Sequence, residues 1–166
     1  MDGELVVLRS LHVLPGVLWV GGSLLMAGVV EPRLRAAGPA VQGPAMRAIG
    51  KRLSLVLTIS GGVSILLGFA LVSRTEGREF GDLFTTSWGW AIGLGMVASL
   101  IGAGLGSSAG RLMRKMDVVS AQVQGQPTPA QQAEMARLLA GLHRGSLISA
   151  LMGAVTVVLM VSARYF

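Results

Sequence analysis

The sequence predicts an all-α integral membrane protein, a four-helix bundle with both termini on the outer side of the membrane. Three observations predict this class. Hydrophobic residues make up 52% of the 166 residues and charged residues only 13%, about half their share in an ordinary soluble domain. Four apolar stretches are each long enough to cross a bilayer as a helix, which takes about 20 residues. The basic residues gather in two loops that four crossings place on the same side.

The predicted spans belong to one domain that covers residues 1–166. A backbone in lipid must satisfy its own hydrogen bonds, and no long alternating segments suggest a β-barrel, so each span is expected to be a helix. The first apolar run is too long and its start too acidic for a cleavable signal, so we expect it to stay as a span. The predicted spans are residues 5–30, 53–73, 88–109 and 145–163.

The loops between the spans predict the orientation. Residues 31–52 and 110–144 hold ten of the fourteen basic residues, whereas residues 74–87 carry more acidic than basic side chains. Short loops rich in Lys and Arg stay in the cytoplasm. We therefore predict cytoplasmic hairpins at 31–52 and 110–144 and a multi-pass protein of the bacterial inner membrane.

Local sequence signals predict that three of the helices continue beyond the lipid. An apolar stripe continues the third helix to about Gln124. The fourth helix is expected to run over residues 129–163, with a capping box formed by Thr128 and Gln131. The second helix is expected to begin at Pro44, before its apolar span.

Glycines inside the spans predict close helix packing. Small residues four apart allow backbones to approach each other where lipid removes the hydrophobic driving force. One interpretation is packing within the bundle. The other is that a glycine face docks a membrane protein partner or a second copy, so that the chain is a cofactor-free accessory subunit of a larger complex. The glycines concerned are Gly89, Gly93, Gly102, Gly106 and Gly110 in the third span and Gly61 and Gly62 in the second.

His12 is the side chain that points most directly to chemistry. An ionisable residue inside a span is costly and marks a functional site by default. His12 is expected about 10 Å below the outer end of the first helix, with Gly16 and Trp19 on the same face. An imidazole beside a glycine notch and a large aromatic ring suits a flat cofactor, and neutral histidine is a common ligand of haem iron. The alternative is that His12 only holds a neighbouring helix by a hydrogen bond.

These residues give a candidate site with b-type haem as its cofactor. His12, Gly16 and Trp19 are the predicted cofactor-binding residues, and His12 is the predicted metal ligand. The other histidine, His143, is expected at the cytoplasmic edge, about 20 Å from His12 in height and therefore too far to ligate the same iron. Thioether sulfur together with imidazole suits Cu(I), so copper handling is a second alternative; the methionines within the spans are Met26, Met96, Met152 and Met160.

Several other classes of function are excluded. The chain contains no cysteine, which removes disulfides, thiolate metal sites and cysteine nucleophiles. The basic residues flank apolar runs instead of alternating with aromatic residues, so no nucleic-acid partner is expected. No motif for catalysis is present, and we do not predict an enzyme.

The first span carries a family resemblance. Leu11-His12, followed by Trp19-x-Gly21-Gly22, resembles small bacterial four-helix membrane proteins that include the copper-resistance-D domain and the haem-linked protoporphyrinogen oxidases. The uncharacterised members of this superfamily are the most similar. The resemblance implies association with b-type haem or copper through His12. Those oxidases carry a lysine in their third span, and residues 88–109 here have none, so oxidase activity is not implied.

Overall fold

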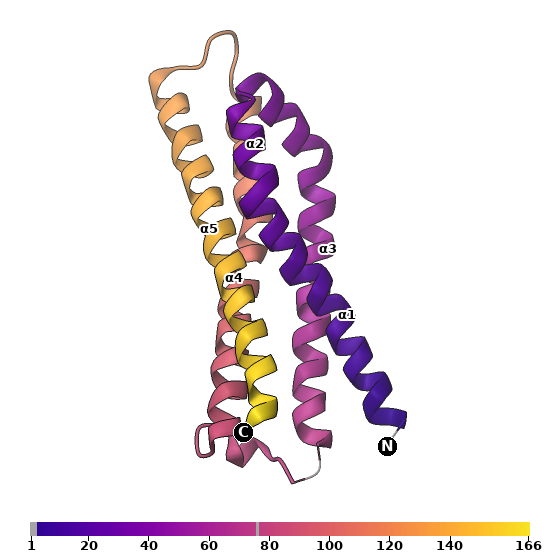
Figure 1. The fold of residues 1–166 in the computed structure, drawn as a ribbon. Coiled ribbons are helices and arrows are strands. Elements are labelled where there is room, and N and C mark those ends of the chain that lie inside the picture. Colours follow the sequence, from indigo (N-terminus) through magenta and orange to yellow (C-terminus); the bar gives the residue numbers. More distant parts are fainter. Residues whose placement is uncertain (1–2, 76) are drawn as a thin grey trace.

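Four long helices build the protein in a computed structural model that describes residues 3–75 and 77–166 (Figure 1). The first crossing consists of α1 (Gly3–Leu25), a π-helical segment η1 (Met26–Val30) and α2 (Glu31–Ala36). The other three crossings are α3 (Pro39–Arg74), α4 (Ser87–Ala121) and α5 (Pro129–Ser162), with short 3-10 turns η2 (Phe80–Asp82) and η3 (Ala163–Tyr165). The described residues contain no strand, so the predicted all-α bundle is confirmed. The predicted acidic start at residues 1–2 and the loop residue Glu76 lie outside the described residues.

All four crossings are long and apolar enough to span a membrane. The surface of the bundle carries many large apolar side chains, with Leu14 68% exposed and Leu66 70% exposed, which suits contact with lipid tails. The buried apolar core is correspondingly thin and is dominated by small residues. It consists of Trp19, Val20, Ala27, Val72, Ala91, Ala98, Leu138, Ala150 and Ala163. The chain is therefore a multi-pass membrane protein.

Two of the predicted helix ends differ from the structure. The second long helix begins at Pro39, five residues before the predicted Pro44, because Gly38 takes a positive φ of 86° and breaks the preceding helix there. Pro44 lies inside α3. The third helix ends at Ala121, slightly before the predicted Gln124.

The start of the fourth helix is confirmed. Thr128 accepts a hydrogen bond from the backbone N–H of Gln131, whose side chain accepts one from the backbone N–H of Thr128. This reciprocal capping box satisfies two backbone donors that a helix start would otherwise leave unpaired. The helix then runs without interruption from Pro129 to Ser162.

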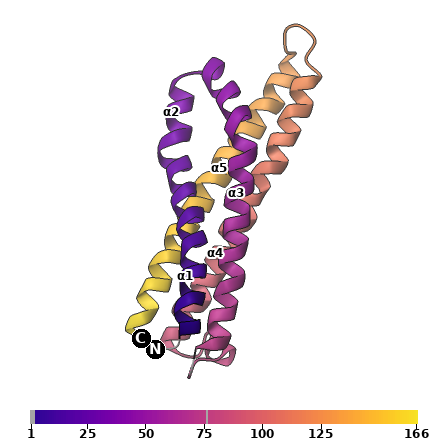
Figure 2. The same ribbon diagram turned by 90° about the vertical axis from the view of Figure 1, so that its right-hand side faces the viewer.

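The first crossing packs against different helices along its length. Its α1 segment packs mainly on α3, and η1 packs on α5. Both termini and the connection between α3 and α4 lie at one end of the bundle, and the two loops rich in basic residues lie at the other (Figures 1 and 2). Beyond the end of α2 and α3, the tip of the α4–α5 hairpin projects by itself, as Figure 2 shows.

Glycines of α4 fit closely against α5. A Cβ added at Gly102 would stand 3.2 Å from Cβ of Met152, and one at Gly106 would stand 3.2 Å from Oγ of Ser149. Ser149 also donates a hydrogen bond of 2.8 Å to the carbonyl oxygen of Gly102. Gly102 and Gly106 therefore pack within the bundle, as the first interpretation of the glycine spacing expects.

Candidate functional site

His12 exchanges two hydrogen bonds with Ser64 across the interface of α1 and α3. Nδ1 of the half-buried imidazole lies 2.8 Å from the carbonyl oxygen of Ser64. The Ser64 hydroxyl in turn donates a bond of 3.0 Å to the carbonyl oxygen of His12. A carbonyl oxygen can only accept, so Nδ1 carries the proton of this bond. In the neutral ring, Nε2 then keeps its lone pair and is the nitrogen able to bind a metal.

Gly68, one turn beyond Ser64 on α3, leaves open the space that the imidazole of His12 occupies. A Cβ at Gly68 would stand 3.1 Å from Cε1 and 3.4 Å from Nδ1 of His12. The ring therefore lies close against the α3 backbone, where a larger residue would displace it. Ser60, Ser64 and Gly68 follow each other at four-residue spacing and so share one face of α3.

Gly16 and Trp19, the other two predicted site residues, take part in helix packing. The space beside Gly16 holds the Ser64 hydroxyl, 2.9 Å from where a Cβ would be. Trp19 is only 5% exposed, and its indole lies against Gly61 of α3. His12 and Gly16 thus both contact Ser64, while Trp19 lies deeper in the bundle. A contribution of Gly16 or Trp19 to cofactor binding stays a prediction.

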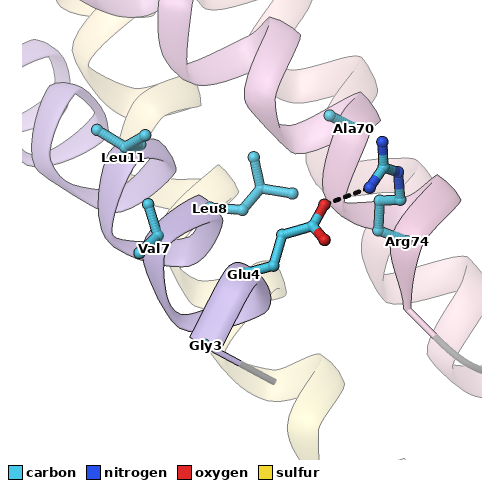
Figure 3. Close-up of a pocket in the computed structure, with 7 residues that line it drawn as sticks. All are labelled: Gly3, Glu4, Val7, Leu8, Leu11, Ala70 and Arg74. Atoms are coloured by element: carbon cyan, nitrogen blue, oxygen red, sulfur yellow. Dashed lines mark hydrogen bonds and ion pairs between the residues drawn. The ribbon is translucent and has the colours of Figure 1, made fainter. Parts of the chain in front are cut away.

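A groove between α1 and α3 opens toward the end of the bundle that holds the termini, and His12 is not among the residues that line it. We call it the α1–α3 groove; its volume is about 360 Å³. Its walls are mostly apolar, and an ion pair between Glu4 and Arg74 crosses it (Figure 3). The lining residues are Gly3, Glu4, Val7, Leu8, Leu11, Ala70 and Arg74. Leu8 precedes His12 by one helical turn, whereas Ala70 and Arg74 lie on a different face of α3 from Gly68, which contacts the imidazole.

His143 belongs to a different cluster at the opposite end of the bundle. Its Nδ1 lies 3.0 Å from Oε1 of Glu31, and Arg35 donates to the same oxygen at 3.0 Å. Glu31 is only 8% exposed and directly follows the π-helical segment η1. It comes 19 residues after His12, about 28 Å along a helix. The two histidines therefore lie too far apart to bind one iron, as predicted.

The hydrogen-bond partners of both histidines are far from them in the sequence and were not predicted. Ser64 lies 52 residues from His12, and Glu31 lies 112 residues from His143. For Ser64 a signal existed, because the small residues Ser60, Ser64 and Gly68 at four-residue spacing predict a close helix contact. For Glu31 the signal was weaker, because an acidic residue at the end of a span is ordinarily solvated.

Within the described residues, no three His, Cys, Asp or Glu side chains gather into a group that could hold a metal ion. A cofactor that supplies its own equatorial ligands needs fewer protein ligands, and a single imidazole meets that need. Comparisons with protein-family models, with curated proteins and with solved structures found no match.

Proposed function

We propose that this membrane protein binds a b-type haem through Nε2 of His12 and serves a redox or haem-handling role. The observation that carries the proposal is the hydrogen bond from Nδ1 of His12 to the carbonyl oxygen of Ser64. Histidines that bind metals ordinarily donate their other ring N–H in this way, which fixes the tautomer and the ring orientation and raises the basicity of the ligating nitrogen.

Apolar residues of α1, Leu8 and Leu11, lie within one helical turn of His12. Both also line the α1–α3 groove in the same half of the bundle. Gly16 and Trp19 contact Ser64 and Gly61 of α3, and we retain them in the proposal as residues that border the cofactor. When bound, haem supplies one-electron chemistry, and the chain supplies the ligand, its orientation and an apolar surrounding.

We further propose that His12 and both termini lie in the outer half of a bacterial inner membrane. The two loops that hold ten of the fourteen basic residues lie at the end of the bundle opposite to the termini. The positive-inside rule assigns that end to the cytoplasm. A reporter fused to the C-terminus tests this orientation, and activity of a cytoplasm-specific reporter there would contradict it.

The test of haem binding is an absorption spectrum of the protein purified in detergent after expression with ample haem. We expect a Soret band in the wild type and in His143→Ala, and its loss in His12→Ala. Circular dichroism shows whether each variant keeps its helices. A colourless wild type, or a folded His12→Ala variant that keeps the band unchanged, would overturn the proposal.

A further inference from the structure

We propose that the α1–α3 groove binds one phospholipid of the phosphatidylethanolamine type, with an acyl chain between the two helices and the headgroup at the ion pair of Glu4 and Arg74. In this assignment Arg74 contacts the phosphate, and Glu4 contacts the ammonium group. The lipid site is independent of haem binding at His12, because this histidine is not among the residues that line the groove.

The groove lies at the level where a bilayer changes from hydrocarbon to headgroups. Its lining extends on α1 from Gly3 to Leu11, about 12 Å along the axis, and on α3 from Ala70 to Arg74, the last residue of that helix. The start of α1 and the end of α3 lie at the same end of the bundle (Figure 1). On both helices, therefore, the charged residue lies near the helix end and the apolar residues lie deeper in the span.

The apolar part of the groove suits an acyl chain. Val7 and Leu11 on its α1 wall are 57% and 51% exposed, and Leu8 and Ala70 complete the apolar walls (Figure 3). Water in such a place finds few hydrogen-bond partners, whereas an acyl chain makes dispersion contacts with all of these side chains. A groove of about 360 Å³ at the edge of a membrane span is therefore a place for a lipid chain.

The charged end of the groove matches a zwitterionic headgroup. Glu4 and Arg74 are the charged residues of the lining, and their charges are opposite. A guanidinium donates two parallel hydrogen bonds to a phosphate, and a carboxylate accepts from the N–H donors of a primary ammonium group. Phosphatidylethanolamine carries both of these partners. Phosphatidylglycerol lacks the cation, and the quaternary ammonium group of phosphatidylcholine has no N–H to donate.

The ion pair of Glu4 and Arg74 can open to admit the headgroup. The two side chains are 73% and 61% exposed, and an exposed ion pair contributes little to stability. The headgroup supplies each side chain with a new partner of opposite charge. The exchange consequently leaves neither charge unpaired.

Native mass spectrometry of the protein in a neutral detergent measures the lipid preference, with the three lipids carrying identical acyl chains. We expect the wild type to bind phosphatidylethanolamine about fivefold more tightly than phosphatidylglycerol or phosphatidylcholine. Equal affinity for the three lipids would overturn the proposal. Tighter binding of phosphatidylglycerol would also overturn it, because that result indicates a general site for anionic lipids.

The two members of the ion pair should change the preference in different ways. Glu4→Gln should abolish the preference for phosphatidylethanolamine over phosphatidylglycerol, because it removes the partner of the ammonium group and leaves Arg74 to an anionic headgroup. Arg74→Gln should weaken the binding of all three lipids about fivefold. If the ion pair only ties α1 to α3, both variants change the three affinities alike, which would overturn the proposal. Arg9→Gln is the matched control, since Arg9 is an exposed arginine of α1 outside the lining.

Ala70→Leu tests the place of the acyl chain, because the larger side chain occupies part of the groove. We expect it to weaken the binding of all three lipids by at least about threefold without changing their order. Circular dichroism shows whether the variant keeps its helices. A folded Ala70→Leu protein that binds lipid like the wild type would place the chain elsewhere and overturn the proposal.

The lipid site and the haem site are separable by experiment. His12→Ala should bind phosphatidylethanolamine like the wild type. A folded His12→Ala variant that loses the lipid would overturn the assignment to the α1–α3 groove, whatever its absorption spectrum.

Discussion

The indole of Trp19 lies face-on against the backbone of Gly61. A Cβ added at Gly61 would stand 3.0 to 3.2 Å from three atoms of the ring. Trp19 also reaches Gly102 of α4, where an added Cβ would stand 3.6 Å from Cζ2. With 5% of its surface exposed, this tryptophan lies where α1, α3 and α4 meet. The distance between α1 and α3, and thus the place of His12, depends on a residue without a side chain at position 61.

Gly61→Ala should therefore destabilise the bundle by about 1–2 kcal/mol. Overpacking of a buried site costs about 1–3 kcal/mol, which exceeds the gain of up to about 1 kcal/mol from replacing a helical glycine by alanine. Unfolding by heat or denaturant in detergent measures the change. The control is Gly62→Ala, next along the helix, where an added Cβ meets nothing within 4 Å and stability should stay equal or rise. Equal stability of the two variants would contradict the close contact with Trp19.

Ser64→Ala should weaken the contact between α1 and α3 by about 0.5–1 kcal/mol, the usual contribution of a hydrogen bond between membrane helices. The variant loses the donor to the His12 carbonyl but keeps the backbone carbonyl that accepts from Nδ1. A bound haem should consequently keep its spectrum. Ser10→Ala is the control, because the Ser10 hydroxyl bonds only within its own helix, to Val6. Loss of the haem band in a folded Ser64→Ala would show that the hydroxyl positions the imidazole.

His143→Ala should lower the stability of the bundle by about 1–2 kcal/mol, because it removes one of the two hydrogen bonds to the buried Glu31 carboxylate. The loss stays moderate because Arg35 remains as a partner of Glu31. Thermal unfolding in detergent checks the value. The exposed neighbour Arg144 provides the control, and Arg144→Ala should stay within about 0.5 kcal/mol of the wild type. If His143→Ala were as stable as the wild type, the bond between His143 and Glu31 would contribute nothing to the stability of the bundle.

Gly102→Val should prevent α4 and α5 from packing, since the added side chain would meet the backbone carbonyl of Ser149 and Cβ of Met152. We expect a loss of at least about 2 kcal/mol and aggregation on gel filtration. Gly104→Val, two residues on, has open space at its Cβ and should remain monodisperse. A stable, monodisperse Gly102→Val protein would instead favour a glycine face that docks a separate partner.

Much of the fold could be predicted from local patterns. The apolar runs identified all four crossings, and Thr128 with Gln131 marked the start of α5 correctly. The sequence predicts the start of α3 at Pro44 and not at Pro39, because a proline is tolerated both at the first position of a helix and, with a lost hydrogen bond, inside one. The positive φ of Gly38, which ends the preceding helix, decided between them.

The candidate site could be predicted only in part. The sequence identified His12 as a histidine deep inside a span, because apolar surroundings make such a residue costly. It did not give the acceptor for Nδ1, the glycine against the ring, or the ion pair of Glu4 and Arg74, because these contacts join residues 52 to 70 positions apart. It also assigned Gly16 and Trp19 to a cofactor wall; the structure shows their contacts with Ser64 and Gly61, and their part in cofactor binding stays a prediction.

The sequence alone therefore determined the number of crossings, their helical form and the place of His12 within the first crossing, since each follows from the solvation of short consecutive segments by lipid or water. Only the tertiary structure decided which face of each helix meets which neighbour. The rotation and register of one helix against another depend on packing between residues far apart in the chain, as in the contacts of Ser64 with His12 and of Glu31 with His143. The hydropathy of each segment gives no information about these pairs.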